Sequence, residues 1–207
     1  MIFAWRVVGL DELARLVVER CGPSRPAIVA VNGHSSSGKT TLAERLAATL
    51  PNAAVLHTDD LAWHQGVFAW DALLVEKVLP VVRSGAPLDY RPPQWVARGR
   101  TDSIRLRRSL QWLVVEGVGA SQASVRGELD AVLWVETEEM TRLGRDVVRV
   151  EENREMSVAD FHSWMAEENA YVVAERPWEH ADLVVYGGLT VEHDRDTEVV
   201  LGVVVPP

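Results

Sequence analysis

A short loop rich in glycine and serine constrains this chain more than any other feature. Residues 33–40 read Gly-His-Ser-Ser-Ser-Gly-Lys-Thr and fit the pattern G-x-x-x-x-G-K-T. An unbroken apolar run, Ala27–Val31, precedes the loop, and residues 41–50 have helical spacing. Backbone N–H groups in such a loop converge on an anion, and the following helix adds its positive dipole end. The pattern therefore predicts a phosphate-binding loop between a buried strand and a helix.

Each fixed position of this loop has a defined task. Gly33 and Gly38 permit backbone angles that turn successive N–H groups inward. Lys39, one of two lysines in the chain, can reach the β- and γ-phosphates and assist catalysis, and the Thr40 hydroxyl can bind Mg²⁺. The alternative is a chance glycine-rich turn. We expect ATP and Mg²⁺ to be bound through residues Gly33, His34, Ser35, Ser36, Ser37, Gly38, Lys39, Thr40 and Thr41.

Two acidic residues follow other apolar runs. Asp59 lies just after Ala53–His57, and Glu116 ends the run Trp112–Glu116. Because the carboxyl ends of parallel strands meet at one edge of a sheet, both acids are expected beside the phosphate loop. Asp59 is then a candidate base for an acceptor hydroxyl and a candidate Mg²⁺ ligand, and Glu116 is a Mg²⁺-associated acid. The alternatives are a helix N-cap for Asp59 and an exposed strand-end carboxylate for Glu116.

Three arginines fall on one face of the helix predicted at Glu138–Glu152. Arg142, Arg145 and Arg149 have the spacing i, i+3 and i+7. A row of guanidinium groups is ill suited to a core and suits a lid that closes over a triphosphate. The alternative is a solvent-exposed face paired with neighbouring acids. We expect Arg142 and Arg145 to act in catalysis and Arg149 to contact the nucleotide.

The segments after Asp59 contain aromatic residues that could contact an acceptor. An aromatic-walled pocket suits a flat or apolar alcohol, and core packing is the alternative for each residue. Five arginines between residues 98 and 108 could contact a substrate phosphate, although alternating strand residues that face water explain them better. The candidate acceptor-binding residues are Asp59, Trp63, Phe68, Tyr90 and Trp95.

Apolar runs alternate with amphipathic segments along the chain. This alternation predicts an α/β fold, a three-layer sandwich with a mostly parallel five-stranded sheet. Glu198–Val205 is a candidate edge strand, and Pro80 marks a kink or an early end of a helix at Trp70–Arg83. The expected core strands are Ala27–Val31, Ala53–His57, Trp112–Glu116, Leu129–Val135 and Ala181–Tyr186.

We expect one domain, residues 1–207, because chains of this length usually form one. Within it we expect an N-terminal helix and linker at residues 1–26, a small hairpin on the acceptor side at 86–108, and a helical lid at 138–156.

Composition excludes several classes of protein. The formal net charge of −9 disfavours nucleic-acid and anionic membrane partners, and a single cysteine cannot form an intrachain disulfide. No run reaches the ~18 apolar residues of a membrane span, and Met1–Leu16 lacks the basic start of a secretory signal. We therefore expect a cytoplasmic protein with no nucleic-acid or membrane partner. The sequence leaves open whether it forms a homo-oligomer.

The order and spacing of these motifs resemble the uridine kinase and nicotinamide riboside kinase group of P-loop kinases. This group is related to phosphoribulokinase and pantothenate kinase. The resemblance runs from about Ala27 to Gly187. The stretches that carry it are Val31–Ala43, Leu50–Asn52, Leu56–Asp60, Val114–Gly117, Thr141–Arg145 and His180–Val185.

The resemblance implies an ATP- and Mg²⁺-dependent kinase that phosphorylates a hydroxyl of a small molecule. It implies Asp59 as the base, Glu116 as the Mg²⁺-associated acid, Arg142 and Arg145 as lid arginines, and a base-contacting position for Tyr90. The chain also departs from the group. Residues 65–68 offer no acid to grip ribose hydroxyls, Trp95 stands where the hairpin histidine is expected, and the tyrosine near residues 62–63 is replaced.

Two other functions stay open at this point. The loop also resembles that of chloramphenicol phosphotransferase, which implies a kinase acting on an antibiotic or another small alcohol. A regulatory protein that binds ATP without catalysis is the other alternative. The chain has neither the Asn-Lys-x-Asp motif of GTPases nor the Leu-Ser-Gly-Gly-Gln stretch of ABC transporters, and it is short for a motor ATPase.

Overall fold

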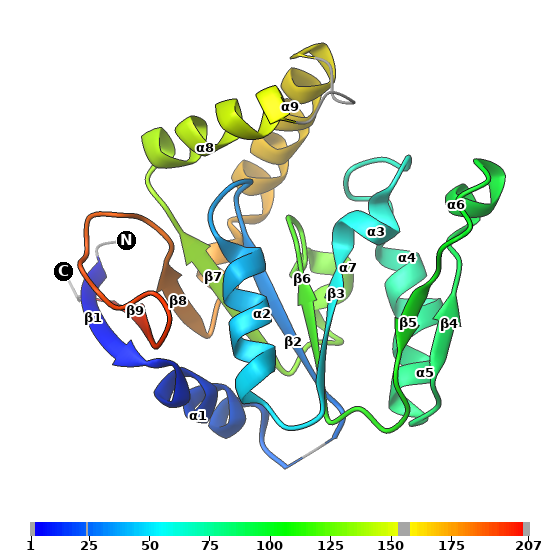
Figure 1. Cartoon of the computed structure of the whole chain (residues 1–207), viewed down its shortest axis with the longest axis horizontal. Coiled ribbons are helices and arrows are strands. Elements are labelled where there is room, and N and C mark those ends of the chain that lie inside the picture. The colour runs from blue at the N-terminus through cyan, green and yellow to red at the C-terminus, as the bar shows by residue number, and fades with distance from the viewer. Residues whose placement is uncertain (1–2, 24, 153–157, 205–207) are drawn as a thin grey trace.

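The computed structural model describes residues 3–23, 25–152 and 158–204. Seven strands form one sheet in the order β1-β9-β8-β7-β2-β6-β3 (Figure 1). The strands of this sheet are β1 (Phe3–Gly9), β2 (Ala27–Gly33), β3 (Ala53–His57), β6 (Trp112–Glu116), β7 (Ala131–Glu136), β8 (Leu183–Tyr186) and β9 (Glu198–Val204). The fold is α/β with a mostly parallel sheet, as predicted.

The expected number of five strands is wrong. The five predicted core strands are present and parallel to one another, but β9 and β1 extend the sheet. β9 is antiparallel to β8, and β1 pairs antiparallel with β9 from Phe3↔Val204 to Gly9↔Glu198, so that β1 and not β9 forms the edge. β1 escaped prediction because its partner lies at the far end of the chain, and local sequence does not encode that pairing.

Alternating residues of β2 divide the core between the two faces of the sheet. Ala27, Val29 and Val31 face helices α1 (Leu10–Cys21) and α2 (Lys39–Thr49). Ile28 and Ala30 face the other way. Because both faces are covered, β2 is apolar at every core position, and the helices and the sheet form three layers. Figure 1 shows α1 and α2 in front of the sheet.

The second face is covered by several shorter elements and by one long helix. Trp134 of β7 and Val184 of β8 pack against that long helix, α9. α8 lies beyond the carboxyl ends of the strands (Figure 1). The bounds of these elements are α3 (Thr58–Ala62), α4 (Asp71–Leu73), α5 (Leu79–Arg83), α7 (Ala123–Arg126), α8 (Glu139–Glu152), α9 (Val158–Glu175) and a 3₁₀ turn at Pro177–His180.

Pro80 neither ends nor breaks the helical segment in which it lies. A π-turn, Leu74–Val78, joins α4 to α5, and the Leu79 N–H donates to the Leu74 carbonyl five residues back. Proline has no N–H to donate, and one wide turn before it keeps the helix continuous.

The predicted hairpin is present beside the main sheet. It consists of β4 (Leu88–Tyr90) and β5 (Ile104–Leu106), which pair antiparallel, with a short helix α6 (Pro93–Ala97) between them. Within the described residues, no helix is long and apolar enough to cross a membrane.

The burial of α1 predicts that two of its residues contribute differently to the free energy of unfolding. Leu13 is fully buried, whereas Val18 is 37% exposed. We expect Leu13→Ala to lower the free energy of unfolding by about 2–5 kcal/mol, because it removes core contacts and leaves a cavity. The matched control Val18→Ala should cost less than about 1 kcal/mol. Urea unfolding of both variants measures this, and equal losses would contradict the packing of α1.

Candidate active site

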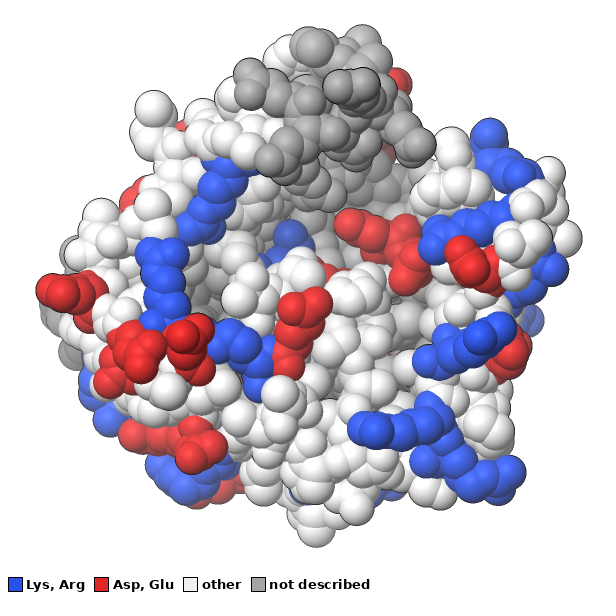
Figure 2. All heavy atoms as spheres, in the orientation of Figure 1, with Lys and Arg blue, Asp and Glu red and all other residues white. Residues whose placement is uncertain are grey.

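A cavity of about 720 Å³ opens at the carboxyl ends of the central strands. Its walls come from the phosphate loop and α2, from α3, from the segment after β6, from α8 and α9, and from the β8–β9 loop. Figure 2 shows this face hollowed at its centre, with basic side chains along its left rim and, across from them, acidic side chains flanked by further basic ones. In an open parallel sheet this is the edge at which ligands bind.

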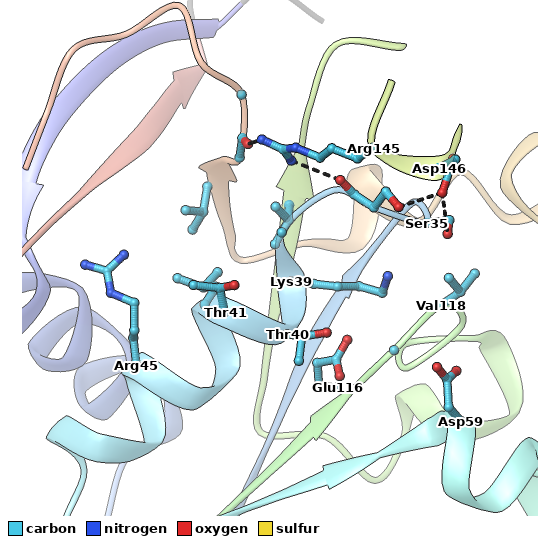
Figure 3. Close-up of a pocket in the computed structure, with 18 of the residues that line it drawn as sticks. Ser35, Lys39, Thr40, Thr41, Arg45, Asp59, Glu116, Val118, Arg145 and Asp146 are labelled. Atoms are coloured by element: carbon cyan, nitrogen blue, oxygen red, sulfur yellow. Dashed lines mark hydrogen bonds between the residues drawn. The ribbon is translucent and has the colours of Figure 1, made fainter. Parts of the chain in front are cut away.

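The loop predicted to bind phosphate has the required backbone shape. Gly38 has φ +97°, a conformation that residues with a Cβ rarely adopt, and α2 begins at the next residue. Lys39 is 7% exposed, lines the cavity, and its Nζ donates to the His34 carbonyl at 3.0 Å. Thr40 and Thr41 also line the cavity. The N-terminal end of α2 therefore faces the cavity together with an ammonium group and two hydroxyls (Figure 3).

Side chains from outside the loop bind its backbone. Arg145 donates from Nη1 to the Ser36 carbonyl at 2.9 Å and from Nη2 to the Gly187 carbonyl at 3.0 Å. The Thr137 hydroxyl donates to the Ser37 carbonyl at 2.8 Å. The bonds to Ser36 and Ser37 satisfy two carbonyls of the loop, and the bond to Gly187 ties the loop to the segment after β8.

Two buried carboxylates also hold the loop, and sequence reasoning missed both. Asp146 of α8 is 1% exposed and accepts hydrogen bonds from the Ser35 and Ser36 hydroxyls at 3.3 and 2.5 Å. Glu168 of α9 is fully buried, accepts from the Ser35 N–H at 3.1 Å, and lies 2.6 Å from His34 Nδ1. Asp146 directly follows an arginine of the predicted row, but nothing local marks Glu168, because its partners lie more than a hundred residues away.

The three arginines of the predicted lid differ in their surroundings. Arg145 lines the cavity. Arg142 is 9% exposed, does not line the cavity, and donates from Nε to the Thr137 carbonyl at 3.2 Å. A row of guanidinium groups is expected to face the cavity or solvent, but Arg142 is buried, with its Nε–H bonded to this carbonyl. Arg149 lies on α8, but its side chain is outside the part of the chain that the structure describes.

The two predicted acids lie together in the cavity wall. Asp59 is in the first turn of α3, and Glu116, 5% exposed, ends β6. The two elements are closely packed, because a Cβ added at Gly117 would lie 1.7 Å from the Thr58 hydroxyl oxygen. Only glycine at position 117 therefore allows α3 to begin this close to the end of β6.

A histidine contacts one of these acids, a role that sequence reasoning did not assign. His57 and Glu116 are register partners on β3 and β6, and His57 Nδ1 lies 2.7 Å from Glu116 Oε2. This hydrogen bond raises the pKa of His57 above its usual 6.5, against the opposing effect of burial. Pairing β3 with β6 in parallel register would have placed His57 beside Glu116, but the sequence does not show that these two strands are neighbours.

Of the four predicted acceptor-binding aromatics, the structure brings only Trp63 to the cavity. Trp95 is 2% exposed, and its Nε1–H donates to the Asp60 carbonyl at 2.8 Å. Phe68 stacks on Tyr171 with ring centroids 4.6 Å apart, and Tyr90 lies on β4 outside the cavity lining. Phe161 and Trp164 of α9 line the cavity instead. Their place depends on how α9 packs, which the helical pattern alone does not specify.

The donors at the cavity suit a nucleotide with its metal ion. The Thr40 hydroxyl and the Glu116 carboxylate are hard oxygen ligands of the kind that Mg²⁺ prefers. Among the described residues, no group of three or more His, Cys, Asp or Glu side chains could by itself hold a metal ion. Mg²⁺ in nucleotide sites needs no such group, because substrate phosphates and water supply its other ligands.

The His57–Glu116 hydrogen bond predicts a pH dependence of stability. Because the folded pKa of His57 is raised, the bond stabilises the fold fully below the unfolded value near 6.5 and is lost as the pH rises through the folded value. In Mg²⁺-free buffer, the ring NMR titration of His57 should have its midpoint above 6.5, and Glu116→Gln should lower that midpoint. His57→Gln should weaken the fall in unfolding free energy above neutral pH. A midpoint at or below the usual value would refute the bond.

The chain resembles a curated protein and several solved structures. The chain is 25% identical over 151 residues to a protein named uridine kinase from Latilactobacillus sakei subsp. sakei (strain 23K), covering 65% of this chain and 72% of the relative. No family model matches the chain.

Two solved structures share the fold. One is named a possible uridine kinase from Bacillus stearothermophilus, with a TM-score of 0.52 and 19% identity, covering 84% of this chain and 98% of that chain. The other is a candidate fructose transport system kinase from Silicibacter sp. TM1040, with a TM-score of 0.51 and 19% identity, covering 84% and 95%. Together these findings confirm the resemblance that the motifs indicate, to uridine kinase-like P-loop kinases.

Proposed function

We propose that this protein transfers the γ-phosphoryl group of ATP to a hydroxyl of a small molecule, with Mg²⁺ present. One observation carries the proposal. Lys39 and Thr40 of the phosphate loop line the same cavity as the two acids Asp59 and Glu116. A protein that only bound ATP would need the loop, whereas a phosphotransferase also needs a carboxylate beside the site of transfer.

Phosphate binding is assigned to the loop and α2. Inward N–H groups of the loop and the Lys39 ammonium hold the β- and γ-phosphates, and the dipole of α2 adds to this field. Thr40 and Glu116 are the residues that would hold Mg²⁺. When bound, Mg²⁺ neutralises part of the charge that the phosphates carry during transfer.

Asp59 is assigned as the base for the acceptor. Its carboxylate accepts the proton of the acceptor hydroxyl as that oxygen forms its bond to the γ-phosphorus. The bond between this phosphorus and the bridging oxygen breaks, and ADP leaves with both electrons of that bond. The side chain needs only a short reach for this, since Asp59 lies in the first turn of a helix whose start packs against Gly117.

Arg145 is assigned to the transferring phosphate. Its guanidinium group lines the cavity at the phosphate loop, where a planar cation can stabilise charge on phosphate oxygens. The relatives named as kinases support this class of reaction.

Replacing Asp59 provides the first test of the reaction. Asp59→Asn should lower kcat by about 10²-fold or more, the usual effect of losing a general base. ATP affinity, measured by calorimetry, should stay within a few-fold, since Lys39 and the loop remain. Acceptor-stimulated ADP release is the readout across nucleosides, pantothenate-like alcohols and antibiotics. Full activity of Asp59→Asn would remove Asp59 from the mechanism.

Two arginines of α8 should differ in their effect on turnover. Arg145→Ala should lower kcat by about 10-fold or more, because it removes a cation at the cavity and the hydrogen bonds to the Ser36 and Gly187 carbonyls. Arg142→Ala should lower the melting temperature, because it leaves the buried Thr137 carbonyl without its donor. If Arg145→Ala leaves turnover unchanged, the lid assignment fails.

A further inference from the structure

The lysine and arginine side chains of the cavity gather on its nucleotide side. They are Lys39, Arg45, Arg145 and Arg195, which come from α2, α8 and the β8–β9 loop. Asp146 lines the same side and accepts hydrogen bonds from the Ser35 and Ser36 hydroxyls, and Glu116 lies beside Thr40 (Figure 3). In Figure 3, Arg45 and Asp59 lie on opposite sides, with the Lys39 ammonium between them. Asp59 of α3 is therefore the acid of the acceptor side.

A smaller cavity of about 110 Å³ adjoins the acceptor side. It shares the lining residues Asp59, Ala62, Val118 and Trp164 with the larger cavity, so the two lie side by side. Its other lining residues are Thr58, Gln65 and Val67. Among the described residues, no lysine, arginine or histidine lines this smaller cavity. An acceptor beside Asp59 therefore meets one carboxylate, an amide, a hydroxyl and mostly apolar atoms.

The nearest arginine of the hairpin is already engaged elsewhere. The Arg100 guanidinium lies 3.2 Å from the Trp95 ring centroid and 5.4 Å from that of Trp63. Its Nη2 lies 3.3 Å from Asp60 Oδ1. This side chain braces α3 against the hairpin, since Trp95 also donates to the Asp60 backbone.

Other arginines of the hairpin turn away from the cavity. Arg105 is exposed and pairs with Asp89 at 3.4 Å, and exposed Arg107 donates to the Ala53 carbonyl. These alternating positions face solvent, as their strand spacing predicts. They supply no positive charge for a second phosphate or a carboxylate on the acceptor.

We infer that the acceptor is an alcohol that carries no phosphate or carboxylate group and that has an apolar or aromatic body. An anionic acceptor would be repelled by Asp59, because within the described residues no lysine, arginine or histidine lines the smaller cavity to offset the repulsion. Trp63, Phe161 and Trp164 supply flat apolar surfaces, which also suit a cationic amine. This inference rests on the proposed function, because it takes Asp59 as the group that faces the acceptor.

Matched pairs of alcohols test the inference. Pantothenate carries a carboxylate where pantothenol has a hydroxymethyl group. In the same way, 4-hydroxyphenyllactate carries a carboxylate on the carbon that bears the aliphatic hydroxyl of tyrosol. Binding of each to the ADP-loaded protein is measured by calorimetry, and turnover by ADP release. We expect the uncharged member to bind at least about tenfold more tightly, a factor that a single unfavourable charge contact supplies. Equal or tighter binding of the anionic members overturns the inference, and so does failure of all four to bind.

Variants in the smaller cavity test the inferred class of acceptor independently. Gln65→Arg places a cation beside Asp59 and should shift the preference toward the anionic members by about tenfold. Gln65→Met is the matched control, because it has similar length without charge and should leave the preference unchanged. Val67→Arg serves the same purpose should Gln65→Arg fail to fold. An unchanged preference in a folded arginine variant contradicts the inference.

The two proposals fail in different ways. If the uncharged members bind more tightly but none stimulates ADP release, phosphoryl transfer is wrong while the acceptor class stands. If the anionic members are phosphorylated faster, phosphoryl transfer stands and the acceptor class is wrong.

Discussion

The arrangement of the site depends on the external bonds that hold the phosphate loop. Several carbonyl, hydroxyl and N–H groups of this loop lie away from water and need hydrogen-bond partners. Arg145 satisfies the Ser36 carbonyl, Thr137 the Ser37 carbonyl, and buried Glu168 the Ser35 N–H. These partners come from α8, from the end of β7 and from α9, which ties the loop to the helices that lie above the sheet.

A second set of contacts positions Asp59 and Glu116 near the phosphate loop. β3 and β6 are parallel and in register, which brings His57 beside Glu116. Gly117 then allows Thr58 to approach closely, and Asp59 follows in the first turn of α3. Phosphate-binding groups and acids thus meet at one edge of the sheet, because β2 lies next to β6 in the strand order. The division of charge across the cavity follows from this topology.

Much of the fold could be predicted, because the five core strands are continuous apolar runs, as expected for strands of a mostly parallel sheet. β2 shows this, since its alternate residues pack on opposite sides. β1 could not be predicted, because its partner β9 is at the other end of the chain. In the site, the motif located Lys39 and Thr40, but the aromatic pattern led to Trp95, which the structure buries beneath Arg100.

The sequence by itself determined the phosphate loop, the positions of the core strands along the chain and the acids that follow them. These are local features, since glycine, lysine and strand-end carboxylates act at positions that spacing alone defines. The tertiary structure decided which side chains surround them. The burial of Arg142, the bonds of Asp146 and Glu168 to the loop, and the absence of cations from the described lining of the acceptor side all depend on contacts between distant segments. Such contacts are set by packing, and packing leaves no regular pattern in the sequence.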